Sequence, residues 1–401
     1  MPVAVDAMGG DRGPTVIVEG TVQAAREPGC PELVLVGDRT VLEKHLLTAL
    51  GSLEPDEAAR TRERIDVHHA PETIGMDESP VAAMRRKRDS SIAGCVELAK
   101  SGRVDALVTA GNTGAAVAAT TRSLRLESVH RPGIAVTLPS KTKVSTVIDV
   151  GANVHCKPIH LFDYGIMATE FCRSMMGIDN PTIGLMNVGE EEDKGNELVR
   201  QTKELFHDSD LNFIGNIEGQ DAFSGKCDII VCEGFVGNVV LKVSEGFAEM
   251  TTSWLRETME KQHTGDDRGV WEKALEVFKE HTDYSSYGGA LLLGVDTTCV
   301  ICHGRSTSSA IANAIRAASR FLEKRVKEHI VEGLRRHAVS KPRNSSPEDP
   351  GLADPRSDHE PRNDHEPRNK HEPRNKRNGH GGSTPGEGSP SSTGEILGQK
   401  P

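Results

Sequence analysis

Apolar residues recur along the chain in short runs, and each run leads into glycine and small polar residues and then into a helical pattern. Residues 33–37 (LVLVG), 106–109 (ALVT) and 227–232 (CDIIVC) are apolar or β-branched at nearly every position. Such a run is typical of a strand buried on both faces of a parallel sheet. Strands that alternate with helices predict an α/β fold with a doubly wound, Rossmann-like sheet, whose ligands bind at the carboxyl ends of the strands.

The same patterns place further elements along the first 338 residues. We expect strands at residues 3–8, 65–69, 134–138, 145–150, 182–187, 212–219 and 297–303. We expect helices at residues 14–26, 41–50, 81–100, 159–176, 197–206 and 309–337, and a long helix that begins near residue 233. The strands at 134–138 and 145–150 flank a short polar stretch, which predicts a hairpin.

One strand-to-helix turn stands out, at Gly111, Asn112, Thr113 and Gly114, between a buried strand and an alanine-rich helix. A turn of this kind directs free backbone N–H groups and the positive end of the helix dipole toward one point. Glycine lets an anionic ligand approach the backbone closely. The alternative is an ordinary strand-to-helix turn without a ligand.

Four other strand ends repeat the arrangement, which favours an anion site over an ordinary turn. The residues concerned are Gly9 and Gly10, Asn153 and Lys157, Lys194 and Asn196, and Asn238 and Lys242. A further strand ends in His303, Gly304 and Ser306. Neither the dinucleotide fingerprint GxGxxG nor the phosphate-loop pattern GxxxxGK is present. We therefore expect these loops to converge on one site for a small anion.

Two surface features suggest binding partners. Arg85, Arg86, Lys87 and Arg88 are four consecutive cations, which form either a solvated helix face or a docking site for an anionic partner. Residues 247–259 and 270–278 carry helical apolar stripes that include both tryptophans, Trp254 and Trp271. We interpret this helix pair as a subunit interface, with an intramolecular core and a membrane-surface contact as alternatives.

Composition narrows the class of protein. The 401 residues suffice for one large two-lobed enzyme, and the start of the chain has neither the basic nor the apolar region of a signal peptide. With no apolar run near the ~20 residues of a membrane span, we expect a cytoplasmic protein. The net charge of −11 belongs entirely to the first 338 residues and argues against nucleic acid as a partner. Although Cys299, Cys302 and His303 match a haem-attachment pattern, that chemistry requires export.

From residue 339 onward the chain changes character. This segment holds 10 of the 21 prolines and no aromatic residue. It also repeats a six-residue unit at positions 358–363, 364–369 and 370–375. A segment of this composition cannot bury enough apolar area to offset its ordering entropy, so we predict that residues 339–401 are a disordered tail.

Taken in order, nine short motifs resemble one family, the phosphate acyltransferases of bacterial phospholipid synthesis. They are DAMGGD (6–11), RRKRDSS (85–91), AGNTGA (110–115), DVGANVHCKP (149–158), NVGEEEDKGNEL (187–198), NFIGNIEG (212–219), EGFVGNVVLK (233–242), YGGALLLGV (287–295) and HGRS (303–306). The resemblance covers about residues 1–335, and the tail has no counterpart. The chain departs from the family at Leu291, usually proline, and at Thr297, usually glycine.

The resemblance implies transfer of a long-chain acyl group from acyl-acyl-carrier-protein to inorganic phosphate, which forms acyl phosphate. It implies a two-lobed fold like those of phosphotransacetylases and isopropylmalate dehydrogenases, and a homodimer. It also implies peripheral association with the cytoplasmic membrane, where acyl phosphate passes to a membrane glycerol-phosphate acyltransferase. The alternatives are a small-acyl phosphotransacetylase that uses coenzyme A and a non-catalytic membrane scaffold.

The implied reaction suits the residues at the strand ends. Phosphate is already an anionic nucleophile and a thioester releases a good thiolate, so the site needs positioning and charge neutralisation, without a metal or cofactor. We assign phosphate to the 111–114 turn with Asn112 and Lys194, and polar contacts to the carbonyl or thiolate to Asn153, Asn238 and His303. Further substrate contacts are expected from Gly9, Gly10, Gly111, Thr113, Gly114, Lys157, Asn196, Lys242 and Ser306. Arg85, Arg86, Lys87 and Arg88 would dock the carrier protein.

Overall fold

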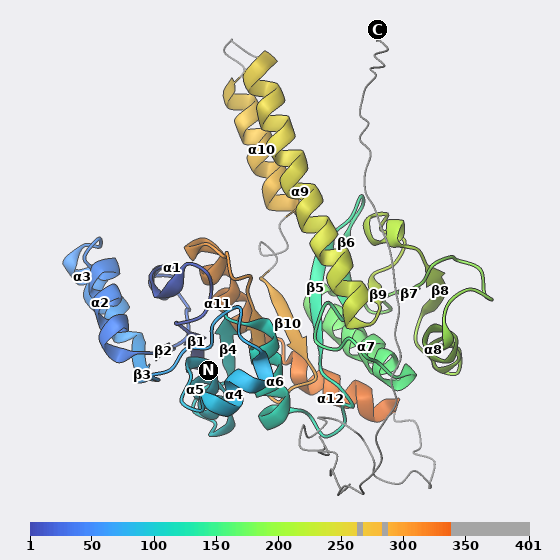
Figure 1. Cartoon of the computed structure of the whole chain (residues 1–401), viewed down its shortest axis with the longest axis horizontal. Coiled ribbons are helices and arrows are strands. Elements are labelled where there is room, and N and C mark those ends of the chain that lie inside the picture. Colours follow the sequence, from blue (N-terminus) through green and yellow to red (C-terminus); the bar gives the residue numbers. More distant parts are fainter. Residues whose placement is uncertain (263–267, 283–287, 338–401) are drawn as a thin grey trace, which may run out of the picture. The chain divides into compact units, whose positions relative to one another are not determined.

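A mixed sheet of 11 strands forms the centre of the protein, in the order β3-β2-β1-β4-β11-β10-β5-β6-β9-β7-β8 (Figure 1). The computed structural model describes residues 1–262, 268–282 and 288–337, so the predicted tail at 339–401 lies outside the described residues. The strands are β1 Val3–Asp6, β2 Leu33–Gly37, β3 Ile65–His69, β4 Ala106–Thr109, β5 Gly133–Pro139, β6 Val144–Ile148, β7 Ile183–Met186, β8 Phe213–Ile217, β9 Ile229–Val231, β10 Ala290–Leu293 and β11 Thr298–Ile301.

The sheet consists of two parallel halves that run in opposite directions. Strands β1, β2, β3, β4 and β11 are mutually parallel, and so are β6, β7, β8 and β9. Between the halves, β10 is antiparallel to β11 and to β5, and β5 forms the predicted antiparallel hairpin with β6. The hairpin reverses the second half, so the carboxyl ends of β1, β4 and β11 leave the sheet at the opposite edge from those of β6, β7 and β9.

Helices cover both faces of the sheet. The helices are α1 Gly13–Ala25, α2 Arg39–Leu50, α3 Pro55–Glu63, α4 Pro80–Arg86, α5 Ser91–Lys100, α6 Thr113–Leu124, α7 Pro158–Phe171, α8 Glu197–His207, α9 Gly234–Gln262, α10 Arg268–Thr282, α11 Ser308–Glu323 and α12 Val326–Arg336. One buried cluster packs α1, α2, α7, α8, α11 and α12 on the sheet, and a second packs α4, α5, α6 and α9. No described helix is both long and apolar enough to cross a bilayer.

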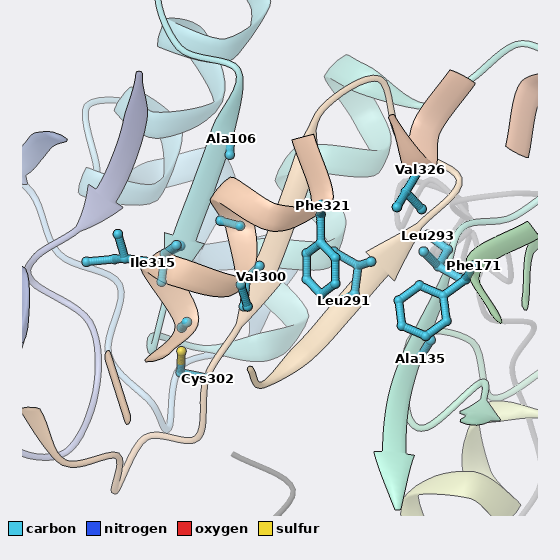
Figure 2. Close-up of a cluster of buried hydrophobic side chains, with 14 of the residues drawn as sticks. Ala106, Ala135, Phe171, Leu291, Leu293, Val300, Cys302, Ile315, Phe321 and Val326 are labelled. Atoms are coloured by element: carbon cyan, nitrogen blue, oxygen red, sulfur yellow. The ribbon is translucent and has the colours of Figure 1, made fainter. Parts of the chain in front are cut away.

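The first cluster joins the two halves of the sheet (Figure 2). Phe171 of α7 and Phe321 of α11 have ring centroids 6.0 Å apart. Leu291 of β10 is 5% exposed in the same cluster and pairs with Val300 of β11 and Ala135 of β5. The position that is usually proline in the family is therefore an ordinary ladder residue in this chain.

Two predicted helices are each broken into two. The helix predicted at 81–100 ends at Arg86, and a second helix begins at Ser91, so Arg85 to Arg88 lie at a break rather than at the front of one helix. The helix predicted at 309–337 is interrupted at Arg325, whose φ of 52° is left-handed. Across Arg325 the apolar spacing continues from Leu322 to Val326, so the pattern did not reveal that break. The first break lies in the polar stretch 85–91, which contains neither glycine nor proline to mark a helix end.

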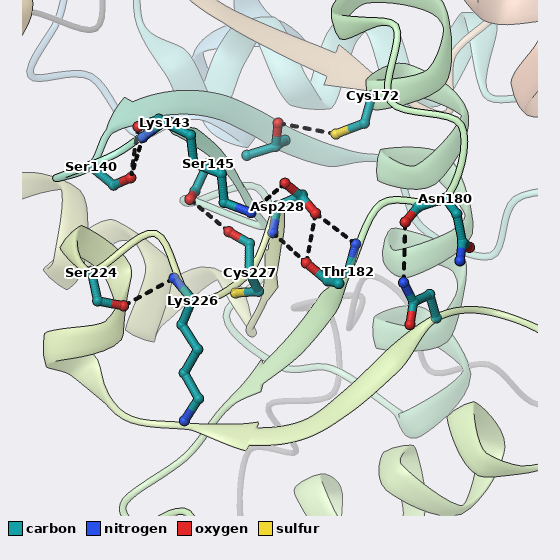
Figure 3. A network of polar contacts seen from close by, with 12 residues as sticks. Ser140, Lys143, Ser145, Cys172, Asn180, Thr182, Ser224, Lys226, Cys227 and Asp228 are labelled. Atoms are coloured by element: carbon teal, nitrogen blue, oxygen red, sulfur yellow. Dashed lines mark hydrogen bonds and ion pairs between the residues drawn. The ribbon is translucent and has the colours of Figure 1, made fainter.

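A buried ion pair holds the amino ends of β6, β7 and β9 together (Figure 3). Lys143 Nζ lies 2.5 Å from Asp228 Oδ1, while Thr182 donates to Asp228 Oδ2 from its backbone N–H at 2.8 Å and from its hydroxyl at 2.6 Å. Burial alone would raise the pKa of Asp228, but the hydrogen bonds from Lys143 and Thr182 outweigh burial and hold the pKa below its ordinary value.

Replacing Asp228 with alanine should therefore destabilise the second half of the sheet, by about 1–3 kcal/mol at neutral pH. Because the folded-state pKa is lowered, this contribution is present above the ordinary carboxyl pKa and is lost as the pH falls through the folded-state pKa. Thermal unfolding at pH 7 and in acid measures both. Glu192→Ala is the control, since Glu192 is 88% exposed in its ion pair with Lys203. A stability loss for Asp228→Ala that is independent of pH would contradict this explanation.

Candidate active site

The glycine turns that follow β1 and β4 are in direct backbone contact. A Cβ atom added at Gly9 would lie 2.5 Å from Gly111 Cα, so only glycine allows this approach. Beneath the turns, the Thr109 hydroxyl donates to Asp6 Oδ2 at 2.7 Å and accepts the Gly111 N–H at 3.0 Å. The Gly111 N–H is therefore engaged within the protein, and its contact with phosphate stays a prediction. Burial raises the pKa of Asp6.

Asn112 is also engaged within the protein. Its Oδ1 caps α6 by accepting the Ala115 N–H at 3.0 Å, and its Nδ2 donates to the carbonyls of Gly75 at 3.2 Å and Glu78 at 3.0 Å. These contacts indicate that Asn112 positions the 75–78 loop against the glycine turn. Thr113 and Gly114 are exposed and begin α6, so their N–H groups have no partner within the helix and remain the donors of this turn.

A third turn, after β11, joins the first two. Asp11 donates its backbone N–H to the Gly304 carbonyl at 2.8 Å, and a Cβ at Gly10 would lie 3.2 Å from the same oxygen. Ser306 has a buried hydroxyl with no hydrogen-bond partner among the described residues. The turns that carry Gly10, Gly111 and Ser306 therefore lie side by side.

Lys242 of α9 meets His303 at this third turn. Lys242 Nζ lies 3.4 Å from His303 Nε2, and His303 Nδ1 accepts the Arg305 N–H at 3.0 Å. Burial, and then the charge of Lys242, lower the pKa of His303, which favours its neutral form. With Nδ1 as acceptor, the imidazole proton is on Nε2. The Nε2–H group and the Lys242 ammonium are then two adjacent donors, which suits an anion placed to receive both.

The loop after β6 forms a second polar group. Asp149 is fully buried and accepts backbone N–H groups from Ile134, Gly151, Ala152 and Asn153, at 2.7–3.1 Å. Asn153 Nδ2 donates to the Pro132 carbonyl at 2.6 Å and to Tyr164 Oη at 2.9 Å. The Nδ2 group of Asn153 is thus occupied within the protein, and its role as a donor to substrate stays a prediction.

Helix α9 connects this loop with the Lys242–His303 pair. Asn238 is exposed, and a Cβ at Gly151 would lie 3.6 Å from its Oδ1. Lys242 follows Asn238 by four residues, so the two side chains lie on the same face of α9, one turn apart. The carboxyl ends of the two halves of the sheet point in opposite directions. Helix α9 nevertheless carries both Asn238, which lies beside the 149–153 loop, and Lys242, which lies beside His303.

Comparison with known proteins identifies the family to which this chain belongs. The family model described as "Fatty acid synthesis protein" matches residues 1–329. The chain is 42% identical over 336 residues to the phosphate acyltransferase of Nitratidesulfovibrio vulgaris (strain DP4), covering 83% of this chain and 94% of the relative. It is 45% identical over 341 residues to the phosphate acyltransferase of Geotalea daltonii, with the same coverage. The chain belongs to the phosphate acyltransferase family.

Membership in the phosphate acyltransferase family confirms the resemblance and the class of enzyme, an acyltransferase of fatty acid and phospholipid synthesis. The fold prediction is confirmed by a phosphotransacetylase structure from Streptococcus pyogenes. That structure has a TM-score of 0.51 and 15% sequence identity, and the match covers 80% of this chain and 94% of that one.

Several predicted site residues of this phosphate acyltransferase do not join the two polar groups. Asn196 caps α8, because its Oδ1 accepts the Val199 N–H at 3.0 Å. Lys157 immediately precedes α7 and donates its backbone N–H to His160 Nδ1 at 3.1 Å. Lys194 is exposed in the loop after β7, and no described contact connects it to Asn238 or His303. These three residues follow strands or begin helices of the second half, and their roles at the site stay predictions.

The cationic cluster is divided between free and paired side chains. Lys87 is partly buried and pairs with Glu78, and it also donates to the Thr73 carbonyl at 2.6 Å. Arg86 lies 3.4 Å from the same carboxylate, whereas Arg85 and Arg88 are exposed. Lys87 is therefore the least exposed of the paired cations, whereas Arg86 pairs with Glu78 but remains exposed.

Three carboxylates at the site were missed by sequence reasoning: Asp6, Asp149 and Glu245. Asp6 ends the buried strand β1, and Asp149 directly follows the buried strand β6, which is a signal the sequence contained. Glu245 lies three residues after Lys242, and its Oε2 is 2.8 Å from Lys242 Nζ. That helical spacing was also readable, but the burial of its second oxygen could be seen only in the fold.

Proposed function

We propose that this phosphate acyltransferase transfers a long-chain acyl group from acyl-acyl-carrier-protein to inorganic phosphate. A phosphate oxygen attacks the thioester carbonyl, the C–S bond breaks, and the carrier leaves as a thiolate that takes up a proton from solvent. The observation that carries the proposal is the pair of adjacent donors, Lys242 Nζ and His303 Nε2, placed beside three glycine turns.

The roles are assigned to the polar groups that lie beside the glycine turns, where Lys242 also forms an ion pair with Glu245. Phosphate would bind between Lys242, His303 and the N–H groups of Thr113 and Gly114, with the buried Ser306 hydroxyl as a further donor. Asn238 would donate to the carbonyl oxygen as negative charge develops there. Asn112 and Asn153 act as positioning residues, and Lys242 takes the role that sequence reasoning gave to Lys194.

The test is phosphate-dependent release of the carrier thiol from hexadecanoyl-acyl-carrier-protein, together with detection of acyl phosphate. Parallel reactions contain hexadecanoyl-coenzyme A or acetyl-coenzyme A. Activity confined to acetyl-coenzyme A would favour the small-acyl phosphotransacetylase. Vesicle binding without acyl phosphate from any donor would favour the non-catalytic scaffold, and either result would overturn the proposal.

The partners form part of the proposal. Trp254 of α9 and Val270 of α10 are 66% and 69% exposed, and the two helices pack against each other. Exposed apolar side chains on paired helices suit a homodimer, which sedimentation equilibrium would detect as twice the monomer mass. We place the enzyme in the cytoplasm at the membrane surface, where a membrane glycerol-phosphate acyltransferase would consume its acyl phosphate.

Carrier docking is assigned to Arg85, Arg86 and Arg88, the exposed members of the cationic cluster. Reversing Arg85 and Arg88 to glutamate should weaken carrier binding roughly three- to tenfold at low salt, with a shallower dependence on salt. Surface plasmon resonance with immobilised carrier at several salt concentrations measures this. Arg335→Glu, at an exposed position of α12, is the control. Equal effects of the two variants would remove the docking assignment.

A further inference from the structure

Glu245 places a carboxylate among the hydrogen-bond donors of the candidate active site. It follows Asn238 by seven residues and Lys242 by three, so the three side chains lie on one face of α9. Glu245 Oε2 is 2.8 Å from Lys242 Nζ, which in turn lies 3.4 Å from His303 Nε2. Burial and Lys242 lower the pKa of His303, and the charge of Glu245 partly raises it. The carboxylate is therefore close enough to act on whatever Lys242 and His303 bind.

The Glu245 carboxylate has acceptor capacity that its contacts leave unused. An ionised carboxylate offers about four lone-pair positions and no proton. Oε2 accepts a hydrogen bond from Lys242 Nζ, whereas Oε1 is buried and has no hydrogen-bond partner within residues 1–262, 268–282 and 288–337. The side chain as a whole is 26% exposed. A small ligand that binds at the Lys242 ammonium would therefore meet a carboxylate that can still accept a proton donor.

A carboxylate in this position discriminates between anions by their protonation. Against a fully deprotonated oxygen it is repulsive, because the two like charges repel and neither group carries a proton to donate. Against a protonated oxygen the same contact is an O–H···O⁻ hydrogen bond, roughly twice as strong as one between neutral groups. At neutral pH inorganic phosphate keeps at least one proton, whereas sulfate, which has the same tetrahedral shape, keeps none. Glu245 should therefore favour phosphate over sulfate.

We infer that Glu245 is a specificity-determining residue, which accepts a hydrogen bond from the protonated oxygen of phosphate while Lys242 and His303 donate to its unprotonated oxygens. This inference rests on the proposed function and adds how the site selects its anion. The contact breaks no bond and transfers no proton.

The same contact also orients the phosphate. Along α9 the order of the side chains is Asn238, Lys242 and Glu245, and the helix advances by about 10 Å over these seven residues, at ~1.5 Å per residue. With the thioester carbonyl at Asn238 and phosphate at Lys242, Glu245 lies on the side of the phosphate away from the carbonyl. The protonated oxygen is therefore held away from the carbonyl, and an unprotonated oxygen faces it.

The test measures sulfate as a competitor of phosphate in thiol release from hexadecanoyl-acyl-carrier-protein, with the ionic strength held constant by sodium chloride. The readout is the ratio of the sulfate Ki to the phosphate KM, which should be at least about ten in the wild type, as expected for one charge-assisted hydrogen bond. Glu245→Gln keeps the shape of the side chain but offers an N–H₂ donor that sulfate can accept. This variant should lower the ratio by about tenfold or more.

The ratio distinguishes anion selection from a merely structural role. If Glu245 only holds Lys242 in place, Glu245→Gln changes the affinities for phosphate and sulfate by the same factor, the ratio stays as in the wild type, and the inference is overturned. Asp11→Asn is the matched control, because Asp11 is an exposed carboxylate at the neighbouring turn, where a Cβ at Gly304 would lie 3.1 Å from its Oδ2. It should leave the ratio unchanged.

The outcomes separate this inference from the function on which it rests. If the wild-type enzyme forms no acyl phosphate, the proposed function fails. If the wild type is active but binds sulfate as well as phosphate, or if Asp11→Asn rather than Glu245→Gln lowers the ratio, only the inference is overturned. Should Glu245→Gln be inactive, isothermal titration calorimetry of wild type and variant with sodium phosphate and with sodium sulfate gives the same ratio from two Kd values, and an equal ratio in both proteins would again overturn it.

Discussion

Replacing Lys242 with alanine is expected to lower kcat/KM for phosphate by about 10²–10³-fold, the usual effect of removing a preorganised donor that faces developing charge. Lys242 Nζ lies 3.4 Å from His303 Nε2, and the two donors together would neutralise the phosphate. Steady-state kinetics with varied phosphate measures the loss. Lys261→Ala is the matched control, because Lys261 is on the same helix and its side chain is 70% exposed.

A second measurement shows whether Lys242 acts through charge at this site. Lys242 helps to hold the pKa of His303 below its ordinary value, so the imidazole in the Lys242→Ala variant should titrate at higher pH than in the wild type. Proton-detected NMR of the His303 ring follows this change. Near-normal turnover at saturating phosphate, with an unchanged His303 titration, would refute both the kinetic and the electrostatic role.

Asp149→Ala should be the most destabilising of the substitutions considered, by about 3–5 kcal/mol. The fully buried carboxylate accepts four backbone N–H groups, from Ile134, Gly151, Ala152 and Asn153, and alanine would leave all of them without an acceptor. Thermal unfolding measures the loss. Asp296→Ala, at a 60% exposed carboxylate paired with Lys327, is the control.

Asp149→Asn separates hydrogen bonding from packing at the same position. Asparagine keeps one acceptor oxygen, but it directs an N–H₂ group toward the Asn153 N–H that Oδ2 now accepts at 2.7 Å. We therefore expect Asp149→Asn to recover only part of the lost stability. Full recovery would mean that shape, rather than the two acceptor oxygens, holds the 149–153 loop.

The local elements of this protein were readable from the sequence because they depend on short-range patterns. Buried strands such as 33–37 and 106–109 are apolar throughout, and both occur where predicted. The β5–β6 hairpin was also predicted, from the polar stretch between its strands. The break at residues 87–90 was missed because the polar stretch there contains neither glycine nor proline. The break at Arg325 was missed because one left-handed residue interrupts an apolar spacing that otherwise continues.

For the candidate site, too, local features were readable from the sequence and tertiary contacts were not. The sequence offered candidates such as Lys242, Asn238 and His303, because glycine turns and polar side chains at strand ends mark them, and their roles stay predictions. Which of these side chains remain available was decided only by tertiary contacts. Asn112 and Asn153 have the same chemistry as Asn238, but their amides are engaged with the backbone carbonyls of Gly75, Glu78 and Pro132.

The amino-acid sequence alone therefore determined the class of fold, the family and a set of polar turns. The tertiary structure decided how those turns combine. Because the hairpin between β5 and β6 reverses half of the sheet, strand ends that look equivalent along the chain leave at opposite edges. One helix, α9, follows β9 of the reversed half and carries Lys242 to His303, at the end of β11 in the first half. Strand direction depends on pairing between distant segments, which no local pattern encodes.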